Sequence, residues 1–176
     1  KDGMLTWGEN PHKQRLGGSY WNNVHGLLLE EVIWDHNGWA DGYDPTGAGG
    51  ANTPQPPSQF SHNVYSSTHN SDQIYDHVIG ARAASQGLQT RSGAQFVDSL
   101  LLDNNIAGND GGGNTTDYTI QGPRGNFSLH LGNVITSAGW RVAPDIGAIN
   151  WGMDIFSKMP SLVDVIVIHC ANPDDP

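Results

Sequence analysis

A short apolar stretch flanked by polar residues recurs along this chain. It occurs at residues 31–37 (EVIWDHN), 76–82 (DHVIGAR), 98–104 (DSLLLDN), 131–137 (LGNVITS) and 164–169 (DVIVIH). So few apolar residues in a row favour a strand over a helix, and the flanking Asp, Asn and Gly favour turns. Each copy therefore predicts one strand beside a tight corner, where Asn and Gly tolerate a left-handed backbone.

The spacing of the copies predicts a solenoid. Aligning their apolar centres, Ile33, Ile79, Leu102, Ile135 and Val167, gives steps of 46, 23, 33 and 32 residues. The first step is twice the second, and the two longer later steps leave room for inserted loops. Repetition with insertions confined to loops indicates coils that stack on one another. We expect these five residues to form one buried column, each above the next.

Glycine and proline separate the remaining segments. Residues 40–59 are rich in both, which predicts a loop that leaves the stack and covers a groove or a partner surface. Residues 107–117 and 139–150 predict further loops. Residues 126–135 alternate between apolar and polar positions, with Phe127 and Leu129 among the apolar ones, which is typical of a half-buried strand.

Composition narrows the function classes. The net charge of −10, with only 8 Lys and Arg among 176 residues, disfavours nucleic acid and anionic membranes as partners. No apolar run approaches the roughly 20 residues of a membrane span. The single cysteine, Cys170, leaves no internal disulfide and no cysteine-based zinc site. Because the chain opens at Lys1 without a signal peptide, we expect residues 1–176 to be a single domain from a processed or longer protein.

Three runs in the first two thirds of the chain resemble a known group of proteins. Residues 26–39 (GLLLEEVIWDHNGW), 60–65 (FSHNVY) and 81–93 (ARAASQGLQTRSG) are similar, in that order, to coils of secreted right-handed parallel β-helix proteins. That superfamily contains pectate lyases, alginate lyases, uronate epimerases and phage tailspikes. The resemblance implies an all-β chain, a right-handed parallel β-helix of about five or six coils with long loops on one flank. It also implies carbohydrate handling outside the cell or on a virion surface.

Polar residues near the predicted corners are candidates for catalysis. They are Asp35, His36, His62, Arg82 and Arg91. A uronate lyase or epimerase needs a cation that neutralises the substrate carboxylate and a base that removes the proton next to it. Arginine fits a carboxylate bidentately, and histidine is a base near neutral pH. The alternative is that these side chains only hydrogen-bond backbone groups at the corners.

Two further sets of residues suggest ligand binding. Trp39, Tyr43, Tyr65 and Gln89 are candidates for contacts with sugar rings, since aromatic side chains at loops and corners offer flat apolar faces with a polar end. Aromatic residues at such places also seal the ends of a core. Asp41 and Asp44 are candidate calcium ligands in the proline-rich loop, although a solvated acidic loop explains them as well.

Three functions follow from these patterns. The leading one is a secreted polysaccharide-active protein, a lyase or epimerase acting on an acidic glycan. The first alternative is a non-catalytic extracellular fibre or tailspike-like virion protein, which needs only coil stacking and self-association into a homo-oligomer. The second is a glycoside hydrolase with paired carboxylates such as Asp35 and Asp103.

Overall fold

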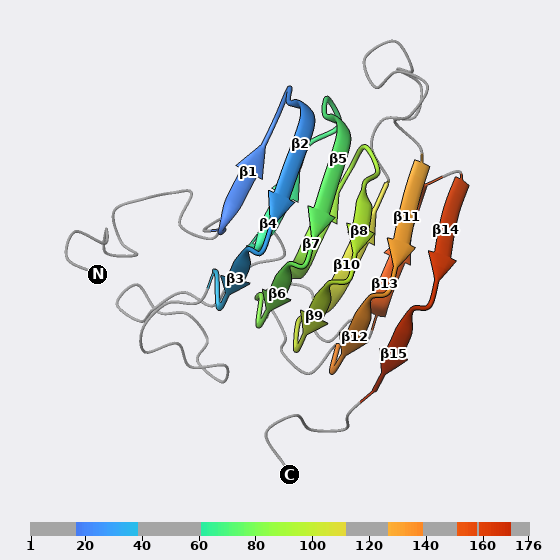
Figure 1. The fold of residues 1–176 in the computed structure, drawn as a ribbon. Helices are drawn as coiled ribbons and strands as arrows, with labels where there is room; N and C mark the ends of the chain where they lie inside the picture. The colour runs from blue at the N-terminus through green and yellow to red at the C-terminus, as the bar shows by residue number, and fades with distance from the viewer. Residues whose placement is uncertain (1–16, 39–60, 112–126, 139–150, 158, 170–176) are drawn as a thin grey trace, which may run out of the picture.

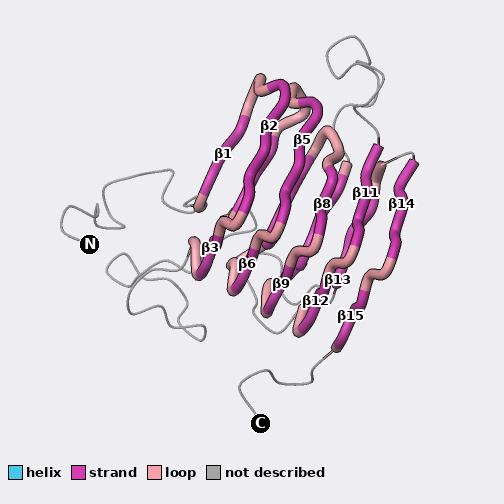
Figure 2. Tube along the Cα trace, in the orientation of Figure 1, coloured by secondary structure: helices cyan, strands magenta, loops and turns pink. Residues whose placement is uncertain are grey.

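The computed structural model describes residues 17–38, 61–111, 127–138, 151–157 and 159–169. Within these ranges the chain forms fifteen short β-strands and no helix (Figure 2). None of the described segments could therefore cross a membrane as a helix. Each paired strand runs parallel to its partner, so the prediction of an all-β chain of parallel strands is confirmed.

The strands belong to three parallel sheets of five. Sheet A contains β1 (Ser19–Trp21), β4 (Val64–Ser66), β7 (Gln86–Thr90), β10 (Ile106–Asp110) and β13 (Trp151–Ile155). Sheet B contains β2 (His25–Glu30), β5 (Ser71–Asp76), β8 (Gln95–Val97), β11 (Phe127–Leu131) and β14 (Met159–Val163). Sheet C contains β3 (Ile33–Asp35), β6 (Ile79–Ala81), β9 (Leu100–Leu102), β12 (Val134–Thr136) and β15 (Ile166–Ile168). Three consecutive strands, one from each sheet, form what we call a rung, so that β1–β3 is rung 1 and β13–β15 is rung 5 (Figure 1).

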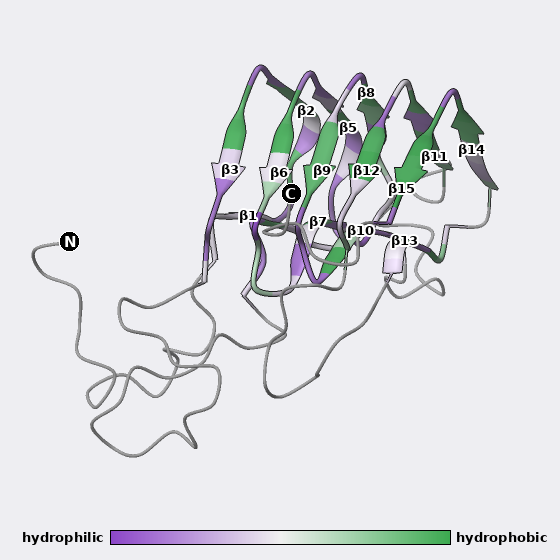
Figure 3. Ribbon diagram, turned by 90° about the horizontal axis from the view of Figure 1, so that it is seen from below, coloured by the Kyte–Doolittle hydropathy of each residue, from purple (hydrophilic) through white to green (hydrophobic). Residues whose placement is uncertain are grey.

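This arrangement is compatible with a parallel β-helix or solenoid. The five copies of the repeated motif contain the five strands of sheet C, as the pattern predicts, and Figure 3 shows how hydrophobic β9, β12 and β15 are. The interpretation of the first spacing is wrong, however. Ile33 pairs directly with Ile79, so 46 residues make a single rung and not two. The added length falls in residues 39–60, outside the described residues, where the predicted loop at 40–59 also lies.

The predicted buried column is also wrong, because its register is inconsistent. Ile33 and Ile79 share one ladder with Leu100, whereas Leu102 belongs to another and Ile135 pairs with Val167 in a third. Ile33 is 66% exposed, and among the five predicted residues only Ile135 is buried. Side chains alternate across a strand, so a shift of one residue reverses the face. Apolar residues occupy both faces of sheet C, which hides that alternation in the sequence.

Left-handed residues form a column at each of two corners. Between sheets B and C they are Glu31, His77, Asp98, Gly132 and Asp164, and after sheet C they are His36, Arg82, Asp103 and Ser137. The corner conformation was predicted, but Asn does not occupy it in either column. Instead, asparagines beside the corners bind neighbouring backbone groups. Asn104 accepts a hydrogen bond from the Ala83 N–H (2.8 Å) and donates one to the Gly80 carbonyl (2.7 Å).

The interior combines aromatic stacking with polar contacts. Tyr75, Phe96 and His130 stack at successive positions of sheet B, with ring centres 5.0 and 4.8 Å apart. His130 Nε2 also lies 3.3 Å from a carboxylate oxygen of Asp110, and both side chains are buried. Along β11, Ser128 and His130 face inward while the apolar Phe127 is exposed. The predicted half-buried strand is therefore present, but its apolar residues point away from the core.

Candidate functional site

A strip of aromatic and polar side chains runs along the outer face of sheet A. The register places Tyr20, Tyr65, Gln89, Asn109 and Asp154 at one position of its five strands. Alternation along each strand turns this ladder away from the interior ladders on either side, but Gln89 and Asn109 are themselves buried, at 3% and 4% exposed. We call these five residues, together with the adjacent His62 and Arg91, the sheet A strip.

Tyr65 is the centre of the aromatic part of the strip. Its ring stacks on Tyr20 with ring centres 5.6 Å apart and on His62 with ring centres 5.3 Å apart. The Cζ atom of Arg91 lies 5.9 Å from the centre of the Tyr65 ring, within the range of a cation–π contact. Tyr20 is 61% exposed and Tyr65 and Arg91 are partly exposed. A flat aromatic surface and a permanent positive charge are thus presented side by side.

A chain of amide hydrogen bonds forms the polar part of the strip. Asn109 Nδ2 donates to Asp154 Oδ2 at 2.6 Å, and Gln89 Nε2 donates to Asn109 Oδ1 at 3.1 Å. An ionised carboxylate can only accept, so Asp154 fixes which end of Asn109 faces it, and Asn109 in turn fixes Gln89. The Gln89 Oε1 atom is then directed elsewhere. It is buried and has no hydrogen-bond partner among the described residues.

His62 is held in its neutral form. Burial, and after it the positive charge of Arg91, lower the pKa of His62 from 6.5 to about 4, although a hydrogen bond with Gln86 acts in the opposite direction. Within the described part of the chain its buried Nδ1 atom has no hydrogen-bond partner. The imidazole is therefore neutral at pH 7, with one ring nitrogen able to accept a proton.

Arg91 also acts on the far end of the strip. Burial raises the pKa of Asp154 above its ordinary value, while the hydrogen bond from Asn109 and the charge of Arg91 act in the opposite direction. One guanidinium therefore influences both a neutral histidine and a half-buried carboxylate. This makes Arg91 the electrostatic centre of the strip.

The remaining predicted catalytic residues lie at the corner after sheet C. Arg82 Nε donates to Asp35 Oδ1 at 2.8 Å, and its Nη2 contacts the other carboxylate oxygen. His36 and Arg82 occupy the left-handed column there, and Asp103 follows one rung later. The Arg82–Asp35 pair joins rung 1 to rung 2, which is a structural role. Asp35 binds Arg82 and lies two rungs from Asp103, so the hydrolase pair of these two carboxylates stays a prediction.

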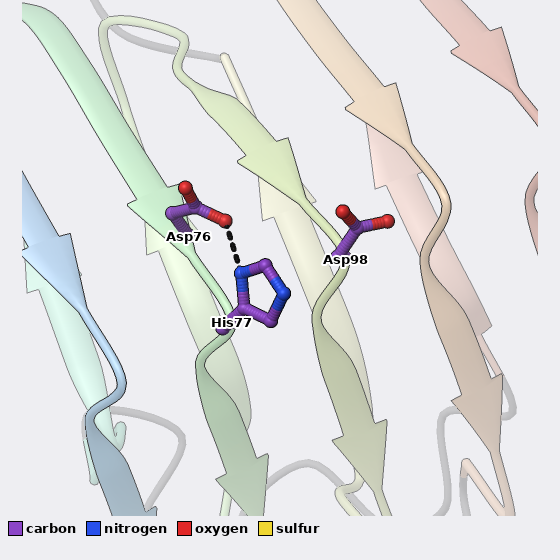
Figure 4. Close-up of side chains that lie close together, drawn as sticks. All are labelled: Asp76, His77 and Asp98. Atoms are coloured by element: carbon purple, nitrogen blue, oxygen red, sulfur yellow. Dashed lines mark hydrogen bonds and ion pairs between the residues drawn. The ribbon is translucent and has the colours of Figure 1, made fainter.

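A third group lies at the corner between sheets B and C. Ligand atoms of Asp76, His77 and Asp98 all lie within 4.8 Å of one another, and His77 Nδ1 is 2.6 Å from Asp76 Oδ1 (Figure 4). The hydrogen bond and charge of Asp76, together with Asp98 and Glu31, raise the pKa of His77. A protonated imidazole between two carboxylates accounts for this geometry, and three such ligands could alternatively hold a divalent cation.

The structure divides the predicted site residues into two groups. His62, Tyr65, Gln89 and Arg91 meet in the sheet A strip, whereas Asp35, His36 and Arg82 lie at the sheet C corner. Trp39, Tyr43, Asp41 and Asp44 lie outside the described residues, so the calcium prediction stays untested.

Sequence analysis missed Tyr20, Asn109 and Asp154. They join the strip through strand register, and the only signal for them was a polar or aromatic residue within a short strand. It also missed the Asp76, His77 and Asp98 group, although its members flank equivalent corners in two motif copies. Function has to be inferred from these geometries. Comparison with protein families, curated proteins and solved structures finds no match for this chain.

Proposed function

We propose that this protein acts on an acidic polysaccharide, which binds along the sheet A strip. The observation that carries the proposal is the position of Arg91, whose guanidinium lies over the Tyr65 ring and influences the buried His62. A guanidinium binds a carboxylate through two parallel N–H···O bonds, and the aromatic face beside it suits the apolar face of a sugar ring. A uronate residue carries both features.

The polar part of the strip supports a ligand that donates hydrogen bonds. Gln89 Oε1 and His62 Nδ1 are buried acceptor positions with no partner among the described residues. A buried polar atom left without a hydrogen bond costs about 1–3 kcal/mol, so a ligand hydroxyl that reaches one gains much of that energy. Sugar hydroxyls next to the carboxylate are donors of this kind.

The reaction that fits these residues begins with removal of the proton next to the carboxylate. Arg91 neutralises the carboxylate and so acidifies that proton, and the neutral His62 accepts it. Carboxylate binding also offsets the charge of Arg91, which raises the pKa of His62 and makes it a stronger base in the complex. In a lyase the C–H electron pair then forms a C=C bond as the neighbouring glycosidic C–O bond breaks, and the leaving oxygen takes that bond's electron pair and a proton from solvent. In an epimerase a proton returns from the opposite face.

The finer features of the fold belong to the same proposal. We infer that the rungs are coils of a right-handed β-helix, because connections between parallel strands of one sheet are right-handed in about 98% of cases. The resemblance of residues 26–39 to secreted polysaccharide lyases and tailspikes supports this assignment and an extracellular location.

Binding and product assays on two matched arginine variants test the proposal. The purified chain is titrated with polygalacturonate, alginate and an uncharged glucan, and unsaturated uronate is followed by ultraviolet absorbance. We expect salt-sensitive binding of the acidic polymers, weakened about tenfold or more in Arg91→Ala, as for loss of a charged hydrogen bond of about 1.5–3 kcal/mol. Arg82→Ala is the control, because Arg82 lies at the corner after sheet C beside Asp35, outside the sheet A strip.

Equal binding by the two variants would overturn the assignment of the strip, and binding by neither parent nor variant would overturn the function. Deuterium exchange from D₂O into the carbon next to the carboxylate detects an epimerase that yields no unsaturated product. If the acidic polymers bind but neither unsaturated uronate nor deuterium incorporation is detected, the protein recognises the glycan without transforming it.

A second candidate, a non-catalytic fibre, is favoured by the open end of the stack. Val167 continues an inward-facing ladder through Ile135, yet it is 59% exposed because no described rung covers it. Leu162, the corresponding residue of sheet B, is also exposed. A fibre built by end-to-end stacking predicts concentration-dependent assembly in analytical ultracentrifugation that Val167→Asp abolishes, with no change in glycan binding.

A further inference from the structure

Sheet B has a pocket on its outer face, away from the sheet A strip. Its volume is about 450 Å³, and its lining includes Asp72, Gly93, Gln95, Phe127 and Met159. Pockets that hold small ligands usually measure about 300–1,000 Å³. None of the residues assigned to the sheet A strip contributes to it. This pocket therefore has room for a ligand of its own.

A glycine opens the floor of the pocket. Extending the registered pairs by two residues places Asp72, Gly93 and Phe127 at one level of rungs 2, 3 and 4. Gly93 has a φ of +83°, and a Cβ atom there would lie 2.5 Å from the Phe127 carbonyl oxygen. Glycine is thus required at this position. With no side chain between them, the carboxylate of Asp72 and the ring of Phe127 border a gap of two rung spacings, about 10 Å.

The lining combines apolar surface with hydrogen-bonding groups. Phe127 and Met159 are 48% and 51% exposed and form the apolar side. The carboxylate of Asp72, the amide of Gln95 and the hydroxyl of Ser161 supply acceptors and donors, and all three residues are exposed. Among the described lining residues Asp72 is the only charged one. Within this part of the lining an anionic ligand would meet a carboxylate and no cation, and is therefore disfavoured.

We propose that this pocket binds a neutral sugar residue. A pyranose ring presents an apolar face that can lie on Phe127, and its hydroxyls both donate and accept hydrogen bonds. Donated hydroxyl bonds suit the carboxylate of Asp72, while the Gln95 amide can serve either role. A purely cationic ligand would use Asp72 and the Phe127 face but would not use the amide N–H donors of Gln95. The mixture of donors and acceptors therefore favours the neutral sugar.

The site is independent of the proposed function. An acidic polymer needs Arg91 on sheet A, whereas the described residues that line the sheet B pocket include no basic group. A protein carrying both would hold neutral and acidic sugars at different faces of one stack.

The test is a titration of the full chain with uncharged methyl glycosides and short neutral oligosaccharides, followed by ¹H–¹⁵N NMR. We expect the amide signals of Gly93 and Gln95 to shift on binding. Phe127→Ala and Asp72→Asn should each raise the dissociation constant about tenfold, whereas Phe127→Trp should retain binding. Phe156→Ala and Asp164→Asn are matched controls, because Phe156 is an exposed phenylalanine outside the lining and Asp164, like Asp72, is an exposed left-handed aspartate.

Three outcomes would overturn the proposal. The first is that no neutral glycoside perturbs Gly93 or Gln95, and the second is that the pocket and control variants bind equally. The third is that tetramethylammonium binds at these residues and the glycosides do not, which would make the pocket a cation site. Arg91→Ala should leave binding of neutral glycosides unchanged, so failure of the acidic-glycan proposal remains distinguishable from failure of this one.

Discussion

The buried His62 should make the stability of this protein fall on mild acidification. Its pKa is lowered from 6.5 to about 4 by burial and by Arg91. Between these two pH values the unfolded chain binds a proton at this residue and the folded chain does not. Stability from this source is therefore complete above pH 6.5 and is lost as the pH falls toward 4. At about 1.4 kcal/mol per pH unit, the loss is about 3 kcal/mol.

Urea unfolding at several pH values between 7 and 4 measures this effect against His62→Gln. The substitution also removes contacts at every pH, so the informative quantity is how the difference in unfolding free energy between parent and variant changes with pH. We expect that difference to shrink by about 3 kcal/mol across the window. In Arg91→Gln, an NMR titration of the His62 ring should give a higher pKa than in the parent, because one of its two lowering causes is removed.

His77 supplies a control of opposite sign. Its pKa is raised, chiefly by the hydrogen bond that its ring donates to Asp76, so its contribution is complete below the unfolded pKa and is lost as the pH rises through the folded one. In the parent, this part of the unfolding free energy should therefore fall as the pH rises above about 6.5, and His77→Gln should remove that fall. If the parent and His62→Gln profiles run parallel from pH 7 to 4, His62 is not held neutral, and its role as a proton acceptor fails with it.

Three further substitutions test the packing. Asn104→Ala removes the partners of the buried Ala83 N–H and Gly80 carbonyl and should cost about 2–6 kcal/mol in chemical unfolding, at about 1–3 kcal/mol for each orphaned group. Because aspartate cannot donate to the Gly80 carbonyl, full stability in Asn104→Asp would show that the second of these hydrogen bonds contributes nothing. Ile135→Ala at a fully buried site should cost about 2–5 kcal/mol, whereas Ile33→Ala, at a 66% exposed site, should cost under about 1 kcal/mol, and similar losses would contradict the register. Gly87→Ala would place a Cβ atom 2.6 Å from the Ala107 carbonyl oxygen and should destabilise by about 1–3 kcal/mol, so unchanged stability would show that the strands can separate there.

The strands of sheet C were predictable because each is a short apolar run beside a polar corner. The motif copies identified all five of them from composition and order alone. The ladder could not be predicted, because Ile33, Trp34 and their equivalents are apolar on both faces and carry no alternation. The 46-residue step was ambiguous for a different reason. A rung with an insertion and two rungs without one have the same length, and only the pairing of Ile33 with Ile79 distinguishes them.

For the sheet A strip, the sequence identified about half of the residues but not how they lie together. His62, Tyr65, Gln89 and Arg91 were selected because polar and aromatic residues at strand ends and corners suit sugars, and this reasoning applied equally to Arg82. The two arginines are separated by the path of the chain. Arg82 closes sheet C beside Asp35, whereas Arg91 follows β7 and reaches Tyr65 of the preceding rung. The carboxylate that Arg82 binds, that of Asp35, is 47 residues away in the sequence, so the sequence alone could not show that pairing.

The stacking of rungs also determines how this protein should open under native conditions. In a chain whose units touch only adjacent units, local unfolding proceeds from an end and involves the loss of one interface at a time. The described strands β7–β9 have paired strands on both sides, whereas β1–β3 and β13–β15 have them on one side only. Native-state amide exchange should therefore be slowest around rung 3 and faster in rungs 1 and 5. Asp154 lies in rung 5 and Tyr20 in rung 1, so both ends of the sheet A strip lie on terminal rungs, and ligand recognition there should be lost before the fold unfolds.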